Sequence, residues 1–199
     1  MPGLGSARFW FVRHGESVAN AEGWLAGHRD VPLTERGVDQ ARALAPELRG
    51  LTPDRVVASD LERAWRTGAL ASHHRLPPLT RIPELRERHV GGWEGIPLTQ
   101  LAQDGAMSVL TSWEGAPPEG ESQRVLSLRV LAWLEANDDR DTLIFAHGGV
   151  IRCVVGLLDG EPTDRIGYGK VGNTEVIARD VAPGTFTRLR QDVLAARRG

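Results

Sequence analysis

The chain has 199 residues, of which 41% are hydrophobic, and its formal net charge is -2. This length suits one globular α/β domain covering residues 1–199, which can bury a core without disulfides or a metal. The nearly balanced charge argues against binding to nucleic acid or to an anionic membrane, because proteins with those partners carry basic patches or tails. The single cysteine excludes an internal disulfide, and no stretch approaches the length of a membrane span. We therefore expect a cytoplasmic protein, and the sequence leaves open whether it forms a homodimer.

The apolar pattern predicts strands that alternate with helices. The expected strands are FWFVR (9–13), DRVVAS (54–59), TLIFA (142–146), NTEVIARDV (173–181) and TFTRLRQDV (185–193), the last two joined by a hairpin-like turn. The expected helices cover 33–50 from Thr34, 60–74 with Ser59 or Asp60 as its cap, a short stretch near 98–110, 122–136 and 150–158. This alternation predicts an α/β fold with a largely parallel sheet and helices on both faces, a three-layer sandwich.

Three of the expected strands end in polar sequences. FWFV leads into Arg13 and His14, RVVA leads toward Arg63 one helical turn later, and TLIFA leads into His147. Ligands of open α/β sheets bind at the carboxyl ends of the strands. If the three strands are neighbours, these four side chains meet in one pocket.

Two arginines and two histidines supply the positive charge and the N–H donors that a phosphoryl group requires. An imidazole held among cations resists protonation, so it can attack phosphorus while the arginines hold the equatorial oxygens. A proton donor is needed for the leaving oxygen, and Glu84 and Glu87 are the candidates that spacing alone does not separate. Two histidines and a carboxylate could instead ligate zinc, but H-E-x-x-H is absent and nearby arginines would repel a dication.

These residues lie in motifs that resemble the histidine phosphatase superfamily, which includes the cofactor-dependent phosphoglycerate mutases. The resemblance covers nearly the whole chain, in six blocks: VRHGES-x-x-N (12–20), LTERG (33–37), SDLERAWRT (59–67), LRERHVGGWEG (85–95), EGES (119–122) and AHGGVIR (146–152). It implies a mixed, mostly parallel sheet flanked by helices, with no metal and no organic cofactor.

The resemblance also implies a role for each site residue. His14 would become the phosphohistidine, and Arg13, Arg63 and His147 would hold the phosphate. Glu87 rather than Glu84 would act first as general acid and then as general base. The substrate side would be lined by four further residues: Asn20, Ala26, Gly27 and Gly148.

Other features have plainer interpretations. Glu16 is expected to cap a helix or to orient Arg13, and Cys153 is expected to be packed in the core. The run 167–172 fits G-x-G-x-x-G but neither follows a strand nor opens a helix, so a plain connection is the favoured interpretation, ahead of a loop that closes over the pocket. Four tryptophans are expected in the core and pocket wall: Trp65, Trp93, Trp113 and Trp133. Of these, Trp93 and Trp113 are expected to lie against the leaving group.

Three functions fit these observations. The first is hydrolysis of a small phosphomonoester through a phosphohistidine. The second is a phosphoglycerate mutase, although the stretch between Gly95 and Glu119 is short for the segments that enclose the sugar acid in mutases resembling this chain. The third is a non-catalytic protein that binds a phosphorylated ligand. The presence of every expected catalytic residue type favours the first.

Overall fold

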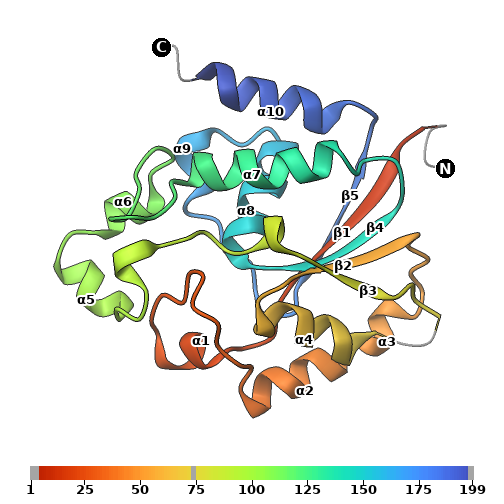
Figure 1. Cartoon of the computed structure of the whole chain (residues 1–199), viewed down its shortest axis with the longest axis horizontal. Coiled ribbons are helices and arrows are strands. Elements are labelled where there is room, and N and C mark those ends of the chain that lie inside the picture. Colours follow the sequence, from red (N-terminus) through yellow and green to blue (C-terminus); the bar gives the residue numbers. More distant parts are fainter. Residues whose placement is uncertain (1–4, 73–74, 197–199) are drawn as a thin grey trace.

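A central five-stranded sheet organises the structure, a computed structural model that describes residues 5–72 and 75–196 (Figure 1). The strands are β1 Ala7–Arg13, β2 Arg55–Ser59, β3 Leu79–Ile82, β4 Thr142–Ala146 and β5 Val176–Val181. Their order across the sheet is β3-β2-β4-β1-β5, and only β5 runs antiparallel to its neighbour. The expected mixed, mostly parallel sheet is confirmed.

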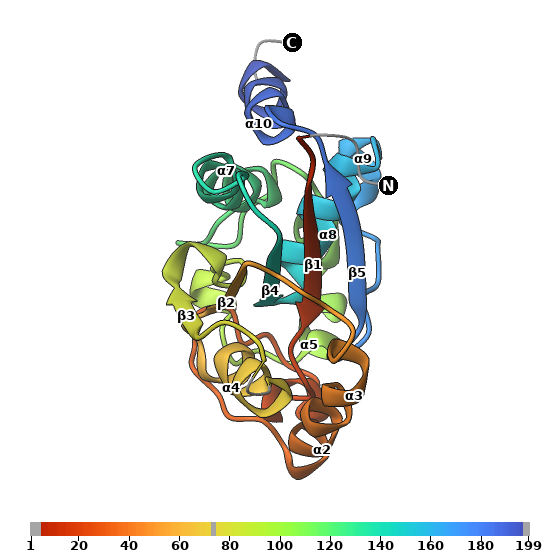
Figure 2. The same cartoon turned by 90° about the vertical axis from the view of Figure 1, so that its right-hand side faces the viewer.

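Helices cover both faces of this sheet (Figures 1 and 2). The α-helices are α1 Val18–Glu22, α2 Glu35–Ala43, α3 Ala45–Leu48, α4 Glu62–Ala71, α5 Leu98–Gln103, α6 Met107–Thr111, α7 Gln123–Glu135, α8 Gly148–Leu158, α9 Thr163–Ile166 and α10 Thr185–Ala195. Two short 3₁₀ helices, η1 Pro83–Leu85 and η2 Gly91–Trp93, interrupt the long connection after β3. Helices α2, α3 and α4 lie on one side of the sheet, and α7, α8 and α10 lie on the other, which gives the expected three layers.

The apolar run of β1 feeds both cores. Phe9 and Phe11 pack in the core under α7, α8 and α10, whereas Trp10 and Val12 pack in the core under α3 and α4. Side chains alternate across a strand, so a strand buried on both faces must be apolar at every position. The same rule explains why β4 is buried along its whole length.

The segment 185–193, expected as a strand, is instead the helix α10. Its buried residues Phe186 and Val193, with the partly buried Leu189 between them, are spaced three and four apart, which is the helical period. The helix packs against α7 at the outer surface of the molecule. The β-branched and aromatic residues at its start produced the wrong prediction, and tertiary packing against α7 decides the outcome.

Two helix predictions also need correction. The expected helix 33–50 begins at its Thr34 cap but is divided into α2 and α3, because Pro46 cannot continue the hydrogen-bonding of α2. Helix α4 has Leu61 at its N-cap and no side-chain cap, so neither Ser59 nor Asp60 has the expected role. It ends at Ala71, and positions 73–74 of the expected helix lie outside the described residues.

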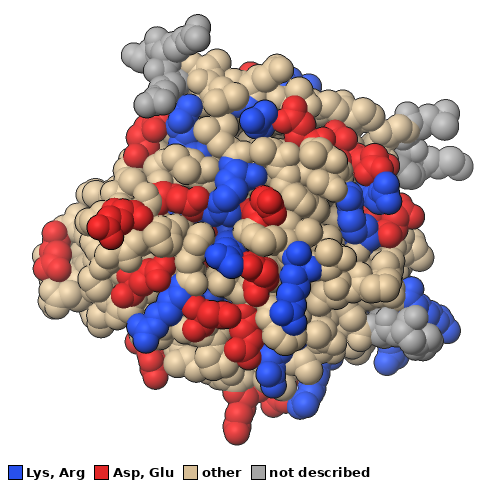
Figure 3. Space-filling model, viewed as in Figure 1, with Lys and Arg blue, Asp and Glu red and all other residues tan. Residues whose placement is uncertain are grey.

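Charged side chains of both signs are interspersed over the face of the molecule shown in Figure 3, with no broad area of one sign. Within the described residues, no helix has the length and apolar character needed to cross a membrane.

Candidate active site

The sheet order brings the polar strand ends together. Strand β4 lies between β1 and β2, and all three run parallel, so their carboxyl ends share one edge of the sheet. His14 directly follows β1 and His147 directly follows β4, and their ring centroids are 5.2 Å apart. Arg63, in the first turn of α4, reaches the same edge from β2. The chain therefore gathers two imidazoles and two guanidiniums at one place.

His14 is buried, and one ring nitrogen has a fixed partner. Its Nδ1 lies 2.7 Å from the carbonyl oxygen of Gly15. A carbonyl only accepts hydrogen bonds, so Nδ1 carries the proton in the neutral ring and Nε2 carries the lone pair. Burial, followed by the positive charge of Arg63, lowers the pKa of His14 well below its usual value. The ring is therefore neutral, and nucleophilic at Nε2, at ordinary pH.

Arg13 and Arg63 are held by backbone carbonyls rather than by carboxylates. Arg13 Nη1 donates to Val171 O at 2.5 Å, and Arg63 Nη2 donates to Gly27 O at 2.8 Å. Neither guanidinium forms an ion pair with a carboxylate of the described residues. The carboxylate of Asp60, which precedes the helix of Arg63, bonds Arg86 and not Arg63. The two positive charges are thus free to act on an anion.

His147 lies beside His14 and is fully buried. Unlike the other three side chains, it is not part of the cavity wall. Neither of its ring nitrogens has a hydrogen-bond partner among the described residues. Burial and the nearby charge of Arg63 lower the pKa of His147 well below its usual value, so this ring is neutral as well.

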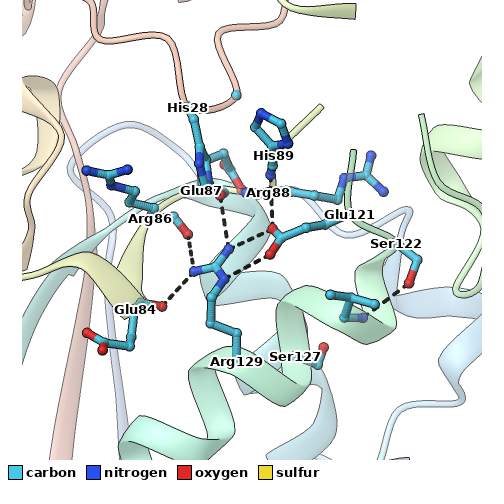
Figure 4. A network of polar contacts seen from close by, with 12 residues as sticks. His28, Glu84, Arg86, Glu87, Arg88, His89, Glu121, Ser122, Ser127 and Arg129 are labelled. Atoms are coloured by element: carbon cyan, nitrogen blue, oxygen red, sulfur yellow. Dashed lines mark hydrogen bonds and ion pairs between the residues drawn. The ribbon is translucent and has the colours of Figure 1, made fainter. Parts of the chain in front are cut away.

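The structure separates Glu87 from Glu84. Glu87 lines the cavity, and its carboxylate accepts hydrogen bonds from Arg88 N at 2.8 Å and from Gly149 N at 3.0 Å. Glu84 is absent from the cavity wall, and its side chain points away from Glu87 in Figure 4. A Cβ atom on Gly149 would overlap the Glu87 carboxylate, so the second glycine of HGG permits the close approach of the acid.

A cavity of about 560 Å³ opens over His14 and is lined by residues of both predicted and unpredicted kinds. The four residues expected on the substrate side all belong to its wall: Asn20, Ala26, Gly27 and Gly148. Sequence reasoning missed most of its apolar wall, which includes Trp24, Leu25, Leu98, Met107 and Leu110.

Trp93 and Trp113 are not in this wall, so their expected place against the leaving group is wrong. Trp113 is buried in the core under α7 and α8 instead. Nothing in local spacing distinguishes it from Trp24, because only the folded loop 23–30 places Trp24 at the cavity.

The G-x-G-x-x-G run forms another part of the wall, so it is more than the plain connection that we preferred. Its Val171 carbonyl accepts the bond from Arg13 described above. Just beyond it, Asn173 Nδ2 donates to His14 O at 2.9 Å and so fixes the backbone of the histidine. Asn173 was missed because no motif or periodicity marks it.

Gly15 and Gly37 explain why RHG and LTERG occur in the same chain. A Cβ atom on Gly15 would overlap the backbone of Gly37, and a Cβ on Gly37 would overlap the backbone of Glu16. The Glu16 carboxylate accepts from Thr34 Oγ1 at 2.9 Å and also bonds Arg36. Glu16 therefore joins the loop after His14 to the start of α2, and it has neither the capping role nor the contact with Arg13 that was expected.

Cys153 is buried in α8, as expected, and burial raises the pKa of its thiol to about 11. It is therefore a packed thiol and not a nucleophile at neutral pH. Among the residues that the structure describes, no group of three or more histidine, cysteine, aspartate or glutamate side chains is placed to hold a metal ion.

Comparison with known proteins identifies the family. The model of the histidine phosphatase superfamily (branch 1) matches residues 9–192. The chain belongs to this superfamily. An adenosylcobalamin/alpha-ribazole phosphatase of Salmonella typhimurium is 36% identical over 188 residues, which are 90% of this chain and 93% of the relative. The chain is an enzyme of the phosphatase type, as the sequence led us to expect.

Two further members of the superfamily frame the question of substrate. The crystal structure of the alpha-ribazole phosphatase from Shigella flexneri has a TM-score of 0.75 and 34% identity, covering 86% of this chain and 89% of its own. A 2,3-bisphosphoglycerate-dependent phosphoglycerate mutase 2 of Gloeobacter violaceus is 32% identical over 89% of this chain and 88% of its own.

Proposed function

We propose that this phosphatase hydrolyses a small phosphomonoester by two displacements at His14. The observation that supports this most directly is the bond from His14 Nδ1 to Gly15 O, which leaves Nε2 unprotonated inside a cationic site. In the first step Nε2 forms a bond to phosphorus as the bond to the alcohol oxygen breaks. In the second step water takes the phosphoryl group from the phosphohistidine and inorganic phosphate leaves.

Arg13, Arg63 and His147 would hold the phosphoryl oxygens during both steps. Phosphoryl transfer depends mainly on positioning and on stabilising the charge of the equatorial oxygens. Two guanidiniums without a carboxylate partner in contact meet this need. His147 is neutral and fully buried beside His14, so it would donate one N–H rather than supply a further charge.

Glu87 would transfer the proton in both steps. Its carboxylate lines the cavity that contains His14, and it is held there by backbone N–H donors. As the acid it gives a proton to the departing alcohol, and as the base it then removes a proton from the attacking water. The same group thus returns to its starting protonation state after each turnover.

The cavity supports a substrate whose alcohol part is bulky and largely apolar. Phosphate alone needs only a fraction of about 560 Å³, and the remaining wall contains Trp24 and four aliphatic or thioether side chains. Leu98 and Met107 are each 39% exposed there, which is costly for large apolar residues unless a ligand covers them. A relative is named for alpha-ribazole, and a phosphorylated molecule with a flat apolar ring would suit this wall.

Phosphoglycerate mutase is the alternative, since a mutase is among the relatives. It differs only in the acceptor, which would be the sugar acid instead of water. The apolar wall favours the phosphatase, because a phosphorylated sugar acid has no apolar face to cover Leu98 and Met107. Phosphate release and 3-phosphoglycerate isomerisation, measured on the same preparation, distinguish the two.

Two features support a small-molecule enzyme that acts in the cytoplasm as one domain. The thiol of Cys153 is free, and the charges in Figure 3 are interspersed rather than gathered as a nucleic acid or membrane would require. Sedimentation of the purified chain would establish whether it is a homodimer.

Rapid-quench labelling tests the mechanism. A phosphomonoester with a labelled phosphoryl group is expected to leave acid-labile, base-stable label on His14, and His14→Ala should abolish labelling and lower turnover by at least about a thousandfold. Chelators should have no effect. Label on any other residue, or turnover that survives in His14→Ala, would refute the mechanism.

A further inference from the structure

Arg129, a partly buried residue of α7, points its guanidinium at the segment that carries Glu87 (Figure 4). This segment, residues 86–90, lies between η1 and η2 and has no helix or strand to satisfy its backbone. Buried carbonyls outside regular structure need other donors. The guanidinium supplies five N–H groups in a fixed plane, which suits this task.

Three carbonyl oxygens, one in η1 and two in the segment 86–90, accept hydrogen bonds from the Arg129 side chain. Arg129 Nη1 donates to Glu84 O at 2.7 Å and to Arg86 O at 3.1 Å, and Nη2 donates to Glu87 O at 3.2 Å. The Glu87 carbonyl also lies 2.8 Å from Nε2 of His28. The main chain of Glu87 is therefore held from two sides.

Glu121 fixes the guanidinium itself. Its two carboxylate oxygens accept from Arg129 Nε at 2.9 Å and Nη2 at 2.7 Å, a two-point pairing. The oxygen that binds Nη2, Oε2, also accepts a hydrogen bond at 3.0 Å from His89 N, two residues after Glu87. Burial alone would raise the pKa of Glu121, but the bonds from Arg129 and His89 outweigh it and the pKa is lowered. The carboxylate is ionised. Together, Arg129 and Glu121 bind the main chain on both sides of Glu87, at Arg86 O and at His89 N.

We propose that Arg129, fixed by Glu121, is a positioning residue for proton transfer by Glu87. The inference rests on the proposed role of Glu87 as acid and base. Bonds to the main chain fix the start of the Glu87 side chain, and Gly149 N fixes its carboxylate end. Loss of the first set leaves the carboxylate free to swing, and a misplaced acid protonates the leaving oxygen poorly. The EGES block, which the mechanism otherwise leaves unused, acquires this purpose through Glu121.

Leaving-group selectivity tests the proposal, measured as kcat/KM because this ratio reports the first phosphoryl transfer. An alkyl phosphate needs the acid, whereas p-nitrophenyl phosphate has a leaving group that departs without a proton. Glu87→Gln should lower kcat/KM for the alkyl ester by about a hundredfold, and kcat/KM for the nitrophenyl ester far less. Arg129→Gln should lower kcat/KM for the alkyl ester by about tenfold, and kcat/KM for the nitrophenyl ester by less than about threefold.

The double variant Arg129→Gln with Glu87→Gln separates positioning from a general loss of structure. If Arg129 acts through Glu87, removing Arg129 in the Glu87→Gln background causes no further selective loss. Arg179→Gln is the matched control, because Arg179 makes a similar two-point pair with Asp159, and neither residue lines the cavity. Arg179→Gln should leave kcat/KM for both esters unchanged.

Arg129→Lys and Glu121→Gln keep the test open if Arg129→Gln does not fold. The lysine retains the charge but cannot span three carbonyls, and Glu121→Gln releases the guanidinium without removing it, so both should show the same selectivity in weaker form. An equal loss on both esters, or full additivity with Glu87→Gln, overturns the positioning role while the phosphatase mechanism stands. No selectivity in Glu87→Gln itself would overturn the role of Glu87, and the positioning role with it.

Discussion

The base of the cavity and its mouth are built in opposite ways. At the base, His14 and Arg63 line the cavity and are 4% and 2% exposed, and His147 lies behind the wall beside His14 with 0% exposed. All three stand at strand ends or in the first turn of a helix on the sheet. At the mouth, Leu98 and Met107 are 39% exposed and belong to α5 and α6, short helices that pack at some distance from the sheet.

This difference assigns reaction and specificity to separate parts of the molecule. A rigid sheet edge holds charged groups within the small tolerances that phosphoryl transfer requires. Short helices and loops can vary in sequence without disturbing that geometry. We expect changes at the base to lower kcat for every substrate, and changes at the mouth to alter KM for some.

The largest effect is expected from Arg63→Gln at the base. Glutamine cannot supply the positive charge or donate to both Gly27 and Arg29 carbonyls, as the guanidinium does. We expect kcat/KM to fall by about a hundredfold to a thousandfold for all phosphomonoesters. Arg66→Gln, on the same helix but with a 49% exposed side chain, is the control and should change little. A loss restricted to bulky esters would contradict the division between base and mouth.

Gly149→Ala should lower activity by disturbing the base of the cavity, without destabilising the protein. The added Cβ would overlap the Glu87 carboxylate, which is the end of a flexible side chain and can move aside. We expect kcat to fall by about tenfold, because the acid is displaced. The free energy of unfolding should stay equal or rise by up to about 1 kcal/mol, since alanine favours a helix over glycine.

Steady-state kinetics and urea denaturation of Gly149→Ala measure the two quantities. Gly50→Ala is the matched control, because its Cβ would meet no atom within 4 Å. Full activity in Gly149→Ala would show that Glu87 does not need its observed position.

At the mouth, Met107→Asn should raise KM for bulky apolar esters by about fivefold, since partial burial of such a side chain by a ligand contributes about 1 kcal/mol. Values for a small phosphomonoester should be unchanged. Val125→Asn is the control, because Val125 is 46% exposed and lies outside the cavity wall. Equal KM changes for small and bulky esters would contradict an apolar subsite.

The last prediction concerns stability against pH, and it depends only on the buried histidines beneath the cavity and not on the exposed mouth. Burial lowers the pKa of His14 and His147 in the folded state, so below about pH 6.5 the unfolded chain binds protons that the folded chain does not. Each histidine contributes about 1.4 kcal/mol over this range, so the free energy of unfolding should fall by about 3 kcal/mol as the pH drops from 7.5 to 5.5.

Urea titrations at both pH values, with His147→Asn as comparison, check this expectation. The variant cannot take up that proton in either state and should lose less stability over the same range. A free energy of unfolding that stays constant or rises on acidification would contradict the assignment of neutral, buried imidazoles.

Sequence reasoning succeeded where local pattern and burial agree. The runs FWFV and TLIFA are apolar at every position because both faces of β1 and β4 are covered, and polar residues follow where the strands leave the core. Position 14 and position 147 could be paired from this alone, given parallel neighbours. The motif blocks added Glu87, which spacing could not separate from Glu84.

It failed where distant contacts decide the outcome. The segment 185–193 is a helix because α7 offers a surface for its buried side, and Trp24 rather than Trp113 reaches the cavity because of the path of one loop. Asn173, Gly149 and Arg129 form hydrogen bonds with residues 42 to 159 positions away, and each of these bonds involves a main-chain atom, which carries no sequence signal.

The sequence by itself determined four of the five strands, the cluster of imidazoles and guanidiniums at the sheet edge, and the family, but it missed the edge strand β3. Each of these follows from residue type and short-range order. Only the tertiary structure decided which nitrogen of His14 is free, which bonds hold the Glu87 carboxylate and what lines the mouth. Those depend on distances between backbone atoms and side chains of separate elements, and such distances exist only once the chain has packed.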